Sequence, residues 1–172
     1  RKKYRKQLNI DENIFIIGMA ARFSPQKNHL FFLNTLKLIN DKKIPFICLL
    51  AGSRINKTNK KLNNFIHDLN LENKVILLDQ IDNVNEFMNA IDIHVLSSSY
   101  GEGFPNVVIE SMSCGTVSIS SNVGDSSIIL NNKKLIFKKD NKQDFLDKLL
   151  YLYDIYLNDL NKWKKISIEN QK

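Results

Sequence analysis

The residues best suited to chemistry are two carboxylates, Glu102 and Glu110, with seven residues between them in the segment SSSYGEGFPNVVIE. Glu102 lies between two glycines, which allow a loop to turn tightly and bring its backbone close to a ligand. Pro105 fits the first position of a helix, where its missing N–H costs nothing. This places Glu102 in a loop and Glu110 inside the helix, about 7 Å further along.

The spacing of Glu102 and Glu110 is comparable to the span from a transferred sugar to a nucleotide ribose, with phosphates between them at the helix end. Carboxylates accept hydrogen bonds from sugar hydroxyls, often two at once. For either glutamate alone, a structural role is the better explanation: Glu102 would support the helix dipole, and Glu110 would lie on a solvated face. For the pair, together with the glycines and the helix start, a ligand site is the better explanation.

A second polar segment, Gly18–Asn28, carries the cations Arg22 and Lys27. Asn28 is a good N-cap, so Lys27 stands beside a helix N-terminus, where a cation is mildly unfavourable. The two cations and the helix end would repel one another unless an anion lay between them, and a diphosphate fits that position. The local sequence alone favours the simpler alternative, in which both side chains extend into solvent.

Short apolar runs alternate with longer amphipathic ones, which predicts an α/β fold. Several apolar runs are nearly continuous, as in strands buried on both faces of a sheet. The expected strands are 14–17, 46–51, 75–78, 93–96, 117–120 and 134–137. The expected helices are 29–40, 59–69, 85–90, 106–114 and 142–157 or beyond. We predict a Rossmann-like parallel six-stranded sheet with helices on both faces, and ligands at the carboxyl ends of the strands.

At 172 residues the chain fits one domain. Residues 1–12 form a charged, helix-capable stretch that we interpret as a linker or the start of the domain, and residues 13–172 as the domain itself. The net charge of +7 lies largely in residues 1–6, 133–139 and 162–165, which we expect to be solvated. Aromatic residues are not interleaved with these cations, so nucleic-acid binding is not expected. Loose attraction toward an anionic membrane is the lesser alternative.

The two cysteines, Cys48 and Cys114, lie in apolar or small-residue segments, which predicts buried free thiols in a reducing compartment. The three histidines lack the spacing of zinc ligands, so no metal site is expected. We find no signal peptide and no apolar run near the ~18 residues that spanning a bilayer needs. A cytoplasmic location, with access to the inner face of the membrane, is therefore expected.

Together these motifs resemble the carboxyl-terminal, donor-binding domain of the retaining glycosyltransferases of group 1 (family 4), which have the GT-B fold. The resemblance covers most of the chain, roughly residues 1–130 and less distinctly beyond. Its specific parts are the loop with Arg22 and Lys27, the turn 50–52, the run 92–98 and the paired-glutamate signature at Glu102 and Glu110. The paired glutamates are the strongest of these.

The resemblance implies roles for these residues. Arg22 and Lys27 would neutralise the donor diphosphate and the departing nucleotide diphosphate, and Glu110 would hold the ribose hydroxyls. Glu102 would hold the donor sugar and distal phosphate, with the segment Gly103, Phe104, Pro105, Asn106 and Val107. Fixed cations and helix N-termini would carry the leaving-group charge, so no metal or cofactor is expected. Transfer would retain configuration, by attack on the same face through an oxocarbenium-like state.

The resemblance also implies partners. The donor would be a nucleotide diphosphate sugar, and the acceptor a glycan or lipid-linked sugar in bacterial cell-surface polysaccharide or capsule synthesis. Family members have an amino-terminal domain that binds the acceptor, and nothing in this chain corresponds to it. Because the sequence also starts without methionine, we expect it to be a fragment that binds nucleotide weakly and transfers nothing by itself. The donor base and sugar, the linkage and the oligomeric state stay open.

Three positions depart from the family pattern: Asp79 replaces a usual glycine, Ser97 a common proline and Ser111 a frequent alanine. The turn 123–127 could touch the ligand, although a simple turn is the favoured interpretation. An epimerase or phosphorylase-like enzyme of the same fold stays open, as does a non-catalytic nucleotide-binding or partner-interaction domain. A dinucleotide-dependent oxidoreductase is disfavoured, because no G-x-G-x-x-G follows the first strand.

Overall fold

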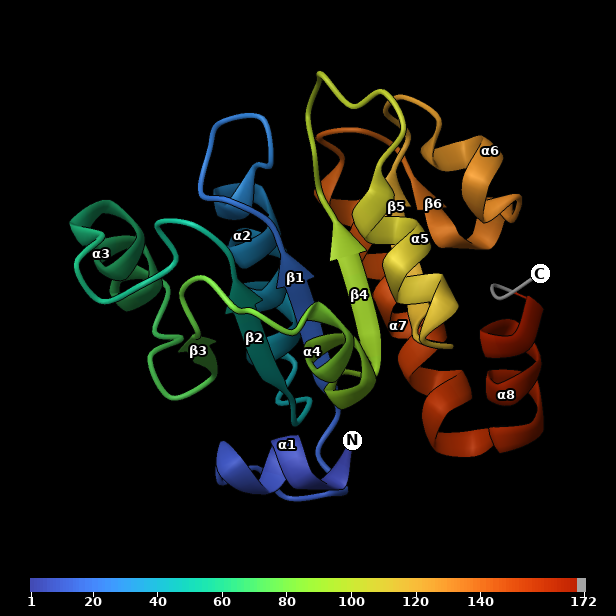
Figure 1. Ribbon diagram of the computed structural model, residues 1–172, viewed down its shortest axis with the longest axis horizontal. Helices are drawn as coiled ribbons and strands as arrows, with labels where there is room; N and C mark the ends of the chain where they lie inside the picture. Colours follow the sequence, from blue (N-terminus) through green and yellow to red (C-terminus); the bar gives the residue numbers. More distant parts are fainter. Residues whose placement is uncertain (170–172) are drawn as a thin grey trace.

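Six parallel strands form one sheet in the order β3-β2-β1-β4-β5-β6, so all their carboxyl ends share one edge (Figure 1). The computed structural model describes residues 1–169; residues 170–172 of the predicted domain lie outside the described residues. The strands are β1 (Ile16–Ala20), β2 (Ile47–Ala51), β3 (Val75–Leu77), β4 (Ile93–Leu96), β5 (Val117–Ser121) and β6 (Ile136–Phe137). The predicted six-stranded parallel sheet is confirmed.

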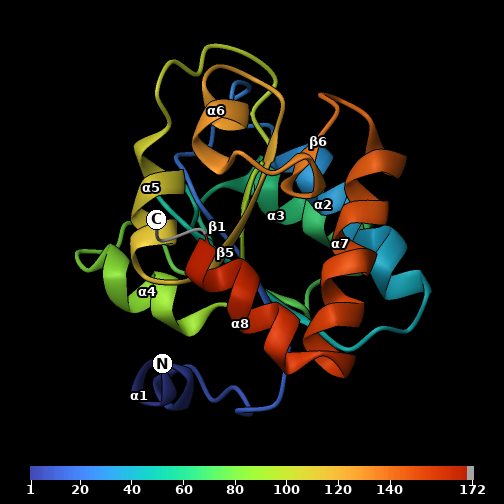
Figure 2. The same cartoon turned by 90° about the vertical axis from the view of Figure 1, so that its right-hand side faces the viewer.

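Helices cover both faces of the sheet, as predicted, with α2 and α7 on one side and α4 and α5 on the other (Figure 2). The helices are α1 (Lys2–Gln7), α2 (His29–Asp41), α3 (Lys60–Asp68), α4 (Val84–Ala90), α5 (Asn106–Ser113), α6 (Ser126–Leu130), α7 (Lys142–Asn158) and α8 (Leu160–Glu169), with a 3-10 turn η1 (Lys133–Leu135). Alternate residues of β1 enter different cores, since Ile17 packs toward α2 while Ile16 packs with Phe87 of α4.

The first strand lies later in the chain than the sequence predicted. It runs over Ile16–Ala20 rather than 14–17, and Ile14 instead offers its carbonyl to the guanidinium of Arg5 at 2.8 Å. We placed Gly18 in the following loop, but it is a central strand residue. A Cβ there would come within 2.6 Å of the Ile91 side chain, so glycine is what lets the end of α4 pack closely on the sheet.

Two predictions for the carboxyl-terminal third need correction. The expected turn 123–127 runs into a short helix, α6, and the expected strand 134–137 is η1 followed by a two-residue β6. The helix expected over 142–157 or beyond is confirmed as α7, and a separate helix, α8, follows it after Asp159. The side chain of Asp159 accepts the backbone N–H of Lys162 at 2.9 Å, which is the bond of an N-cap and starts the new helix.

We expected the basic stretch 1–6 to be solvated, but Arg5 is only 1% exposed. Its guanidinium donates to the carboxylate of Asp92 and to the carbonyl of Ala90, both at 2.8 Å. Arg5 thereby fixes α1 under the amino ends of β1 and β4. Within residues 1–169, no helix combines the length and apolar character that crossing a bilayer requires.

Candidate donor site

Four loops meet at the carboxyl edge of the sheet, at the top of Figure 1: 21–28 after β1, 97–105 after β4, 122–125 after β5 and 138–141 after β6. Backbone hydrogen bonds join them. Ser99 N–H donates to the Gln26 carbonyl at 2.9 Å, and Asp125 N–H donates to the Gly103 carbonyl at 3.0 Å. The loops that carry the predicted site residues are therefore in direct contact.

The predicted cation Lys27 and the predicted carboxylate Glu102 form an ion pair, with Nζ 2.5 Å from Oε1. Their side chains are 17% and 7% exposed, so the pair is largely shielded from water. The Ser98 hydroxyl donates to the same carboxylate oxygen at 2.5 Å. We expected an anion to relieve the charge beside the helix N-terminus, and the carboxylate of Glu102 supplies a negative charge there.

Gln26 contacts three residues of the candidate site, although sequence reasoning did not single it out. Its Nε2 donates to the carbonyl of Gly101 at 2.8 Å and lies 3.5 Å from Oε1 of Glu102, while its Oε1 accepts from Arg22 at 3.4 Å. The carboxamide thus connects the cationic loop with the acidic loop. Arg22 itself is exposed. The only sequence signal was the position of Gln26 next to Lys27.

The start of α5 differs by one residue from the prediction. Pro105 stands at the N-cap, with φ −77° and ψ 91°, rather than at the first helical position. Its carbonyl accepts the N–H of Val108 at 3.0 Å, so proline, which lacks an N–H itself, still begins the first turn. Gly115, with φ 71°, follows the end of α5, and its N–H donates to the Met112 carbonyl at 2.8 Å.

The predicted donor-binding residues divide by exposure. Gly103, Phe104, Asn106 and Glu110 are exposed, and Phe104 keeps 61% of its surface in contact with solvent. Pro105 and Val107, by contrast, face inward: Pro105 is buried, and Val107 packs partly against both hydrophobic clusters. Val107 can offer a ligand only its backbone, whereas Pro105 has no N–H to offer and its carbonyl already accepts from Val108. Further along α5, Val108 is buried and Ile109 is half-buried.

The turn after β5 supports the acidic loop from below. Gly124 has φ 59°, and a Cβ there would lie 2.1 Å from the carbonyl oxygen of Glu102. A side chain at this position would displace the loop that carries Glu102. The buried hydroxyl of Ser126 donates to the Val123 carbonyl at 2.9 Å and holds the turn as α6 begins. The turn after β5 therefore contacts the acidic loop.

A third loop that the sequence did not single out also reaches the site. The Asn28 side chain donates to Ser99 Oγ at 2.6 Å and to the carboxylate of Asp140 at 3.1 Å, and Ser99 donates to Asp140 at 3.0 Å. Asn28 also caps α2 as predicted, since its side chain accepts the N–H of Phe31 at 3.3 Å. One residue therefore caps a helix and connects two loops.

Two buried histidines lie near the Lys27 loop. Burial lowers the pKa of His94 to about 3 and that of His29 to about 4, and the charge of Lys27 acts in the same direction on both. His94 Nδ1 shares a hydrogen bond with Ser118 at 3.1 Å, but its Nε2 has no hydrogen-bond partner within residues 1–169. Both rings are therefore neutral at physiological pH.

The edge beyond β2 and β3 forms an open groove of about 510 Å³, lined by Ser53, Arg54, Asn56, Thr58, Asn59, Lys60 and Asp79. Asp79 has φ 56°, the left-handed conformation that glycine adopts most easily, which explains why glycine is usual at this position. Its carboxylate accepts from Asn56 at 2.9 Å. The other departures are accommodated: the Ser97 hydroxyl donates to the Lys27 carbonyl at 2.9 Å, and Ser111 is buried.

The cysteine prediction holds in part. Both thiols are free; Cys48 is buried, but Cys114 is only partly buried because it caps the end of α5. Burial raises the pKa of the Cys114 thiol, and the nearby Glu110 charge adds to the effect. Among residues 1–169, no group of three or more His, Cys, Asp or Glu is arranged to hold a metal ion.

The six-stranded parallel sheet with helices on both faces matches the fold of solved GT-B glycosyltransferases. In agreement, the structure superposes on the glycosyltransferase of Rickettsia africae with a TM-score of 0.84 and 23% identity, over 99% of this chain and 47% of that one. It also superposes on the carboxyl-terminal domain of the group 1 glycosyl transferase LpcC from Francisella tularensis, with a TM-score of 0.77 and 21% identity, over 99% and 89% of the chains.

The sequence profile of the glycosyl transferases group 1 matches residues 1–170, and the chain belongs to this family. It is 30% identical over 132 residues to the Escherichia coli UDP-Gal:alpha-D-GlcNAc-diphosphoundecaprenol alpha-1,3-galactosyltransferase, covering 74% of this chain and 33% of the relative. It is 29% identical over 148 residues to the O-antigen biosynthesis glycosyltransferase WclY of Escherichia coli, covering 86% and 40%. The chain therefore spans a third to two fifths of these relatives.

Proposed function

We propose that this chain is the donor-binding domain of a retaining glycosyltransferase that transfers a sugar from a nucleotide diphosphate sugar to a glycan or lipid-linked acceptor in bacterial cell-surface polysaccharide synthesis. The observation that carries the proposal is the meeting of Lys27, Glu102 and the start of α5 at one edge of the sheet, with Glu110 exposed further along the helix. Family membership supports the reaction class.

In this proposal Arg22 and Lys27 bind the diphosphate. Lys27 is paired with Glu102, and an ammonium can donate three hydrogen bonds, so it can reach a phosphate oxygen while keeping this pair. Arg22 brings a second, exposed cation, and the N-terminus of α5 adds backbone dipoles. As the donor bond breaks, charge develops on the departing phosphate, and these fixed groups stabilise it without a metal or cofactor.

Glu110 is proposed to hold the ribose and Glu102 the donor sugar. Glu110 is exposed on α5, one helical turn and more beyond the loop, and a carboxylate there can accept from two neighbouring hydroxyls. Glu102 is restrained by Ser98 and Lys27 through one oxygen, Oε1, which leaves Oε2 available to a sugar hydroxyl. Acceptor binding is assigned to a separate amino-terminal domain, and association with the inner membrane face is proposed for the whole enzyme.

The test is calorimetric titration of the 172-residue chain with UDP, GDP and ADP. We expect UDP to bind most tightly, because the Escherichia coli relative uses UDP-Gal. Glu110→Ala should weaken this binding at least about tenfold, since a hydrogen bond to a charged group contributes about 1.5–3 kcal/mol. Glu86→Ala, which removes an exposed glutamate from α4, should leave it unchanged.

Binding of none of the three nucleotides would favour a non-catalytic partner-interaction domain instead. For the full-length enzyme, product analysis separates sugar transfer from epimerisation, and the anomeric configuration of the product separates retention from inversion. The isolated chain should transfer no sugar, so measurable transfer by these 172 residues would overturn the division of labour between the two domains.

A further inference from the structure

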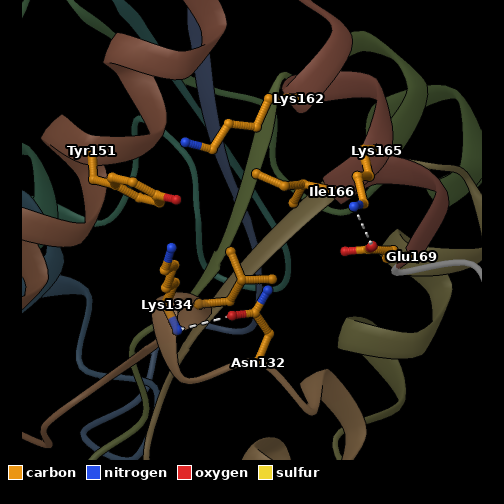
Figure 3. Close-up of a pocket in the computed structure, with 8 residues that line it drawn as sticks. Asn132, Lys134, Tyr151, Lys162, Lys165, Ile166 and Glu169 are labelled. Atoms are coloured by element: carbon orange, nitrogen blue, oxygen red, sulfur yellow. Dashed lines mark hydrogen bonds and ion pairs between the residues drawn. The ribbon is translucent and has the colours of Figure 1, made fainter. Parts of the chain in front are cut away.

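A basic pocket of about 240 Å³ lies between η1, α7 and α8 (Figure 3). The sequence placed two of its lysines in separate basic runs that we expected to be solvated, with Lys134 in one and Lys162 in the other. The fold brings both to the same aromatic ring: each Nζ lies 5.3 Å from the centre of Tyr151. In Figure 3 the two side chains approach the ring from opposite sides.

The charges of this pocket are unbalanced. A third ammonium, that of Lys165, lies 3.8 Å from the carboxylate of Glu169, the one acidic residue among those that line the pocket. The residues that line the pocket therefore carry three cations and one carboxylate, and the carboxylate pairs with Lys165. Contact with Tyr151 stabilises Lys134 and Lys162 individually, but it does not remove the repulsion between them.

The floor of the pocket is apolar, because Leu135 is fully buried and Ile166 is 8% exposed. These side chains exclude water from one side and strengthen the field of the cations above them. Figure 3 shows the Tyr151 hydroxyl pointing into the same space, where it can donate a hydrogen bond. The arrangement therefore offers ammonium groups and a hydroxyl from several directions to one small anion.

The pocket is separate from the donor site. Lys134 and Leu135 precede β6, at the amino end of the strand, whereas the donor loops follow the carboxyl ends. β6 is also the edge strand of the sheet, so the pocket lies at its border, away from Glu102 on the loop after β4.

We propose that this pocket binds a phosphoryl group, presented as a phosphate monoester or diester. A monoester carries nearly two negative charges and three acceptor oxygens, so it can satisfy several ammonium groups at once, which a carboxylate with its single charge does less well. The phosphoryl group can belong to a soluble phosphate ester or to the headgroup of an anionic lipid. The proposal does not depend on the donor site.

The soluble source is tested by titrating the full chain with glycerol 3-phosphate, following the fluorescence of Trp163. This is the only tryptophan, and it adjoins Lys162 in α8. We expect saturable binding that weakens with added salt. Lys134→Gln combined with Lys162→Gln should raise the Kd at least about tenfold. The matched control, Lys57→Gln with Lys61→Gln, removes the same charge from exposed positions near α3 and should change the Kd less than about twofold.

The lipid source is tested by co-sedimentation with vesicles of phosphatidylglycerol in phosphatidylcholine, compared with phosphatidylcholine alone. Vesicle binding that the pocket variant loses and the control variant keeps assigns the pocket to a lipid headgroup, while glycerol 3-phosphate binding alone assigns it to soluble esters. Equal loss in both variants, or binding of neither probe, would overturn the proposal. Melting curves establish that the variants fold, and unchanged UDP binding would show that the two sites are independent.

Discussion

Two long-range ion pairs stand at opposite edges of the same sheet, and they differ in how completely they are satisfied. At the amino edge, Arg5 and Asp92 are each 1% exposed. Besides Arg5, Asp92 accepts the backbone N–H of Ile16 at 2.7 Å and the guanidinium of Arg1 at 2.5 Å. Arg5 also donates to three backbone carbonyls, of Glu12, Ile14 and Ala90.

At the carboxyl edge, Lys27 and Glu102 are paired at 2.5 Å, but 17% and 7% of their side chains stay exposed. Glu102 offers one oxygen to Lys27 and Ser98, and Lys27 retains donors that this pair does not use. Similar pairs of opposite charge therefore serve different ends. The amino-edge pair is closed and holds the fold, while the carboxyl-edge pair keeps unused hydrogen-bonding capacity, as the proposed donor site requires.

The largest expected effect comes from breaking the closed ion pair between Arg5 and Asp92. Arg5→Met leaves the buried Asp92 with the partly exposed Arg1 as its counter-charge and leaves three backbone carbonyls without their donor, so we expect a loss of about 3–5 kcal/mol in the free energy of unfolding. Urea denaturation followed by circular dichroism measures it. Lys3→Met, at an exposed position of the same helix, should stay within about 0.5 kcal/mol of the parent. A similar small effect for Arg5 would show that the pair is not structural.

The second effect concerns the two histidines close to the carboxyl edge. Their folded pKa values, about 3 for His94 and about 4 for His29, lie below the ordinary 6.5. As the pH falls, the unfolded state therefore takes up protons before the folded state does. The stability contributed by the neutral rings is fully present above pH 6.5 and is lost as the pH falls toward the folded pKa values. Each histidine should contribute a loss of roughly 1 kcal/mol per pH unit below 6.5.

Urea denaturation between pH 7 and pH 5 tests this, with His94→Leu as the variant. This variant removes one titrating ring, so the slope of the free energy of unfolding against pH should fall by about the contribution of one histidine. His67→Leu is the matched control, because the side chain of His67 is 77% exposed and its replacement should leave the slope unchanged. Identical slopes for all three proteins would contradict the assignment of neutral, buried rings.

A third, smaller effect concerns the strength of the ion pair between Lys27 and Glu102. A double-mutant cycle of Lys27→Met and Glu102→Gln should give a coupling energy of about 1–2 kcal/mol, below that of a closed buried pair because water reaches both side chains. The exposed pair Lys37–Asp41 in α2 is the control, with an expected coupling under about 0.5 kcal/mol. Coupling no greater than in the control would mean that Glu102 does not neutralise Lys27.

The smallest expected effect separates backbone conformation from side-chain contact at Asp79. Asp79→Gly loses the hydrogen bond from Asn56 but relaxes the left-handed backbone, so the free energy of unfolding should change by less than about 1 kcal/mol. Asp79→Val should destabilise by about 1–2 kcal/mol, because a β-branched residue is strained at positive φ. Thermal melts compare the stabilities of the two variants. Equal destabilisation by both would show that the carboxylate of Asp79, and not its backbone conformation, determines stability at this position.

Much of the sheet could be predicted, because strands buried on both faces have continuous apolar sequences. β4 was predicted at Ile93–Leu96 and is found there. The error in β1 has a physical cause: Gly18 resembles a loop residue in sequence, and only the close packing of Ile91 explains why glycine belongs in the strand. α6 was missed because its five residues are too few to show helical periodicity.

The roles of the site residues, predicted from the resemblance, stay predictions, but their placement is informative. Arg22, Lys27, Glu102 and Glu110 were found because charged residues beside glycines, an N-cap and a helix start form a pattern in sequence. Gln26 was not found, since a glutamine gains significance only through the loop it reaches. Ser99 and Asp140, joined across 41 positions of chain, were missed for the same reason.

The sequence by itself determined the α/β architecture, the edge of the sheet where ligands would bind and the charged residues offered there, because periodicity, capping and glycine placement are local properties. The tertiary structure alone decided which charges meet. It paired Lys27 with Glu102, buried Arg5 against Asp92, and brought Lys134 and Lys162 to one tyrosine ring. Electrostatic interactions depend on distance and burial in three dimensions, and neither is written in the order of residues along the chain.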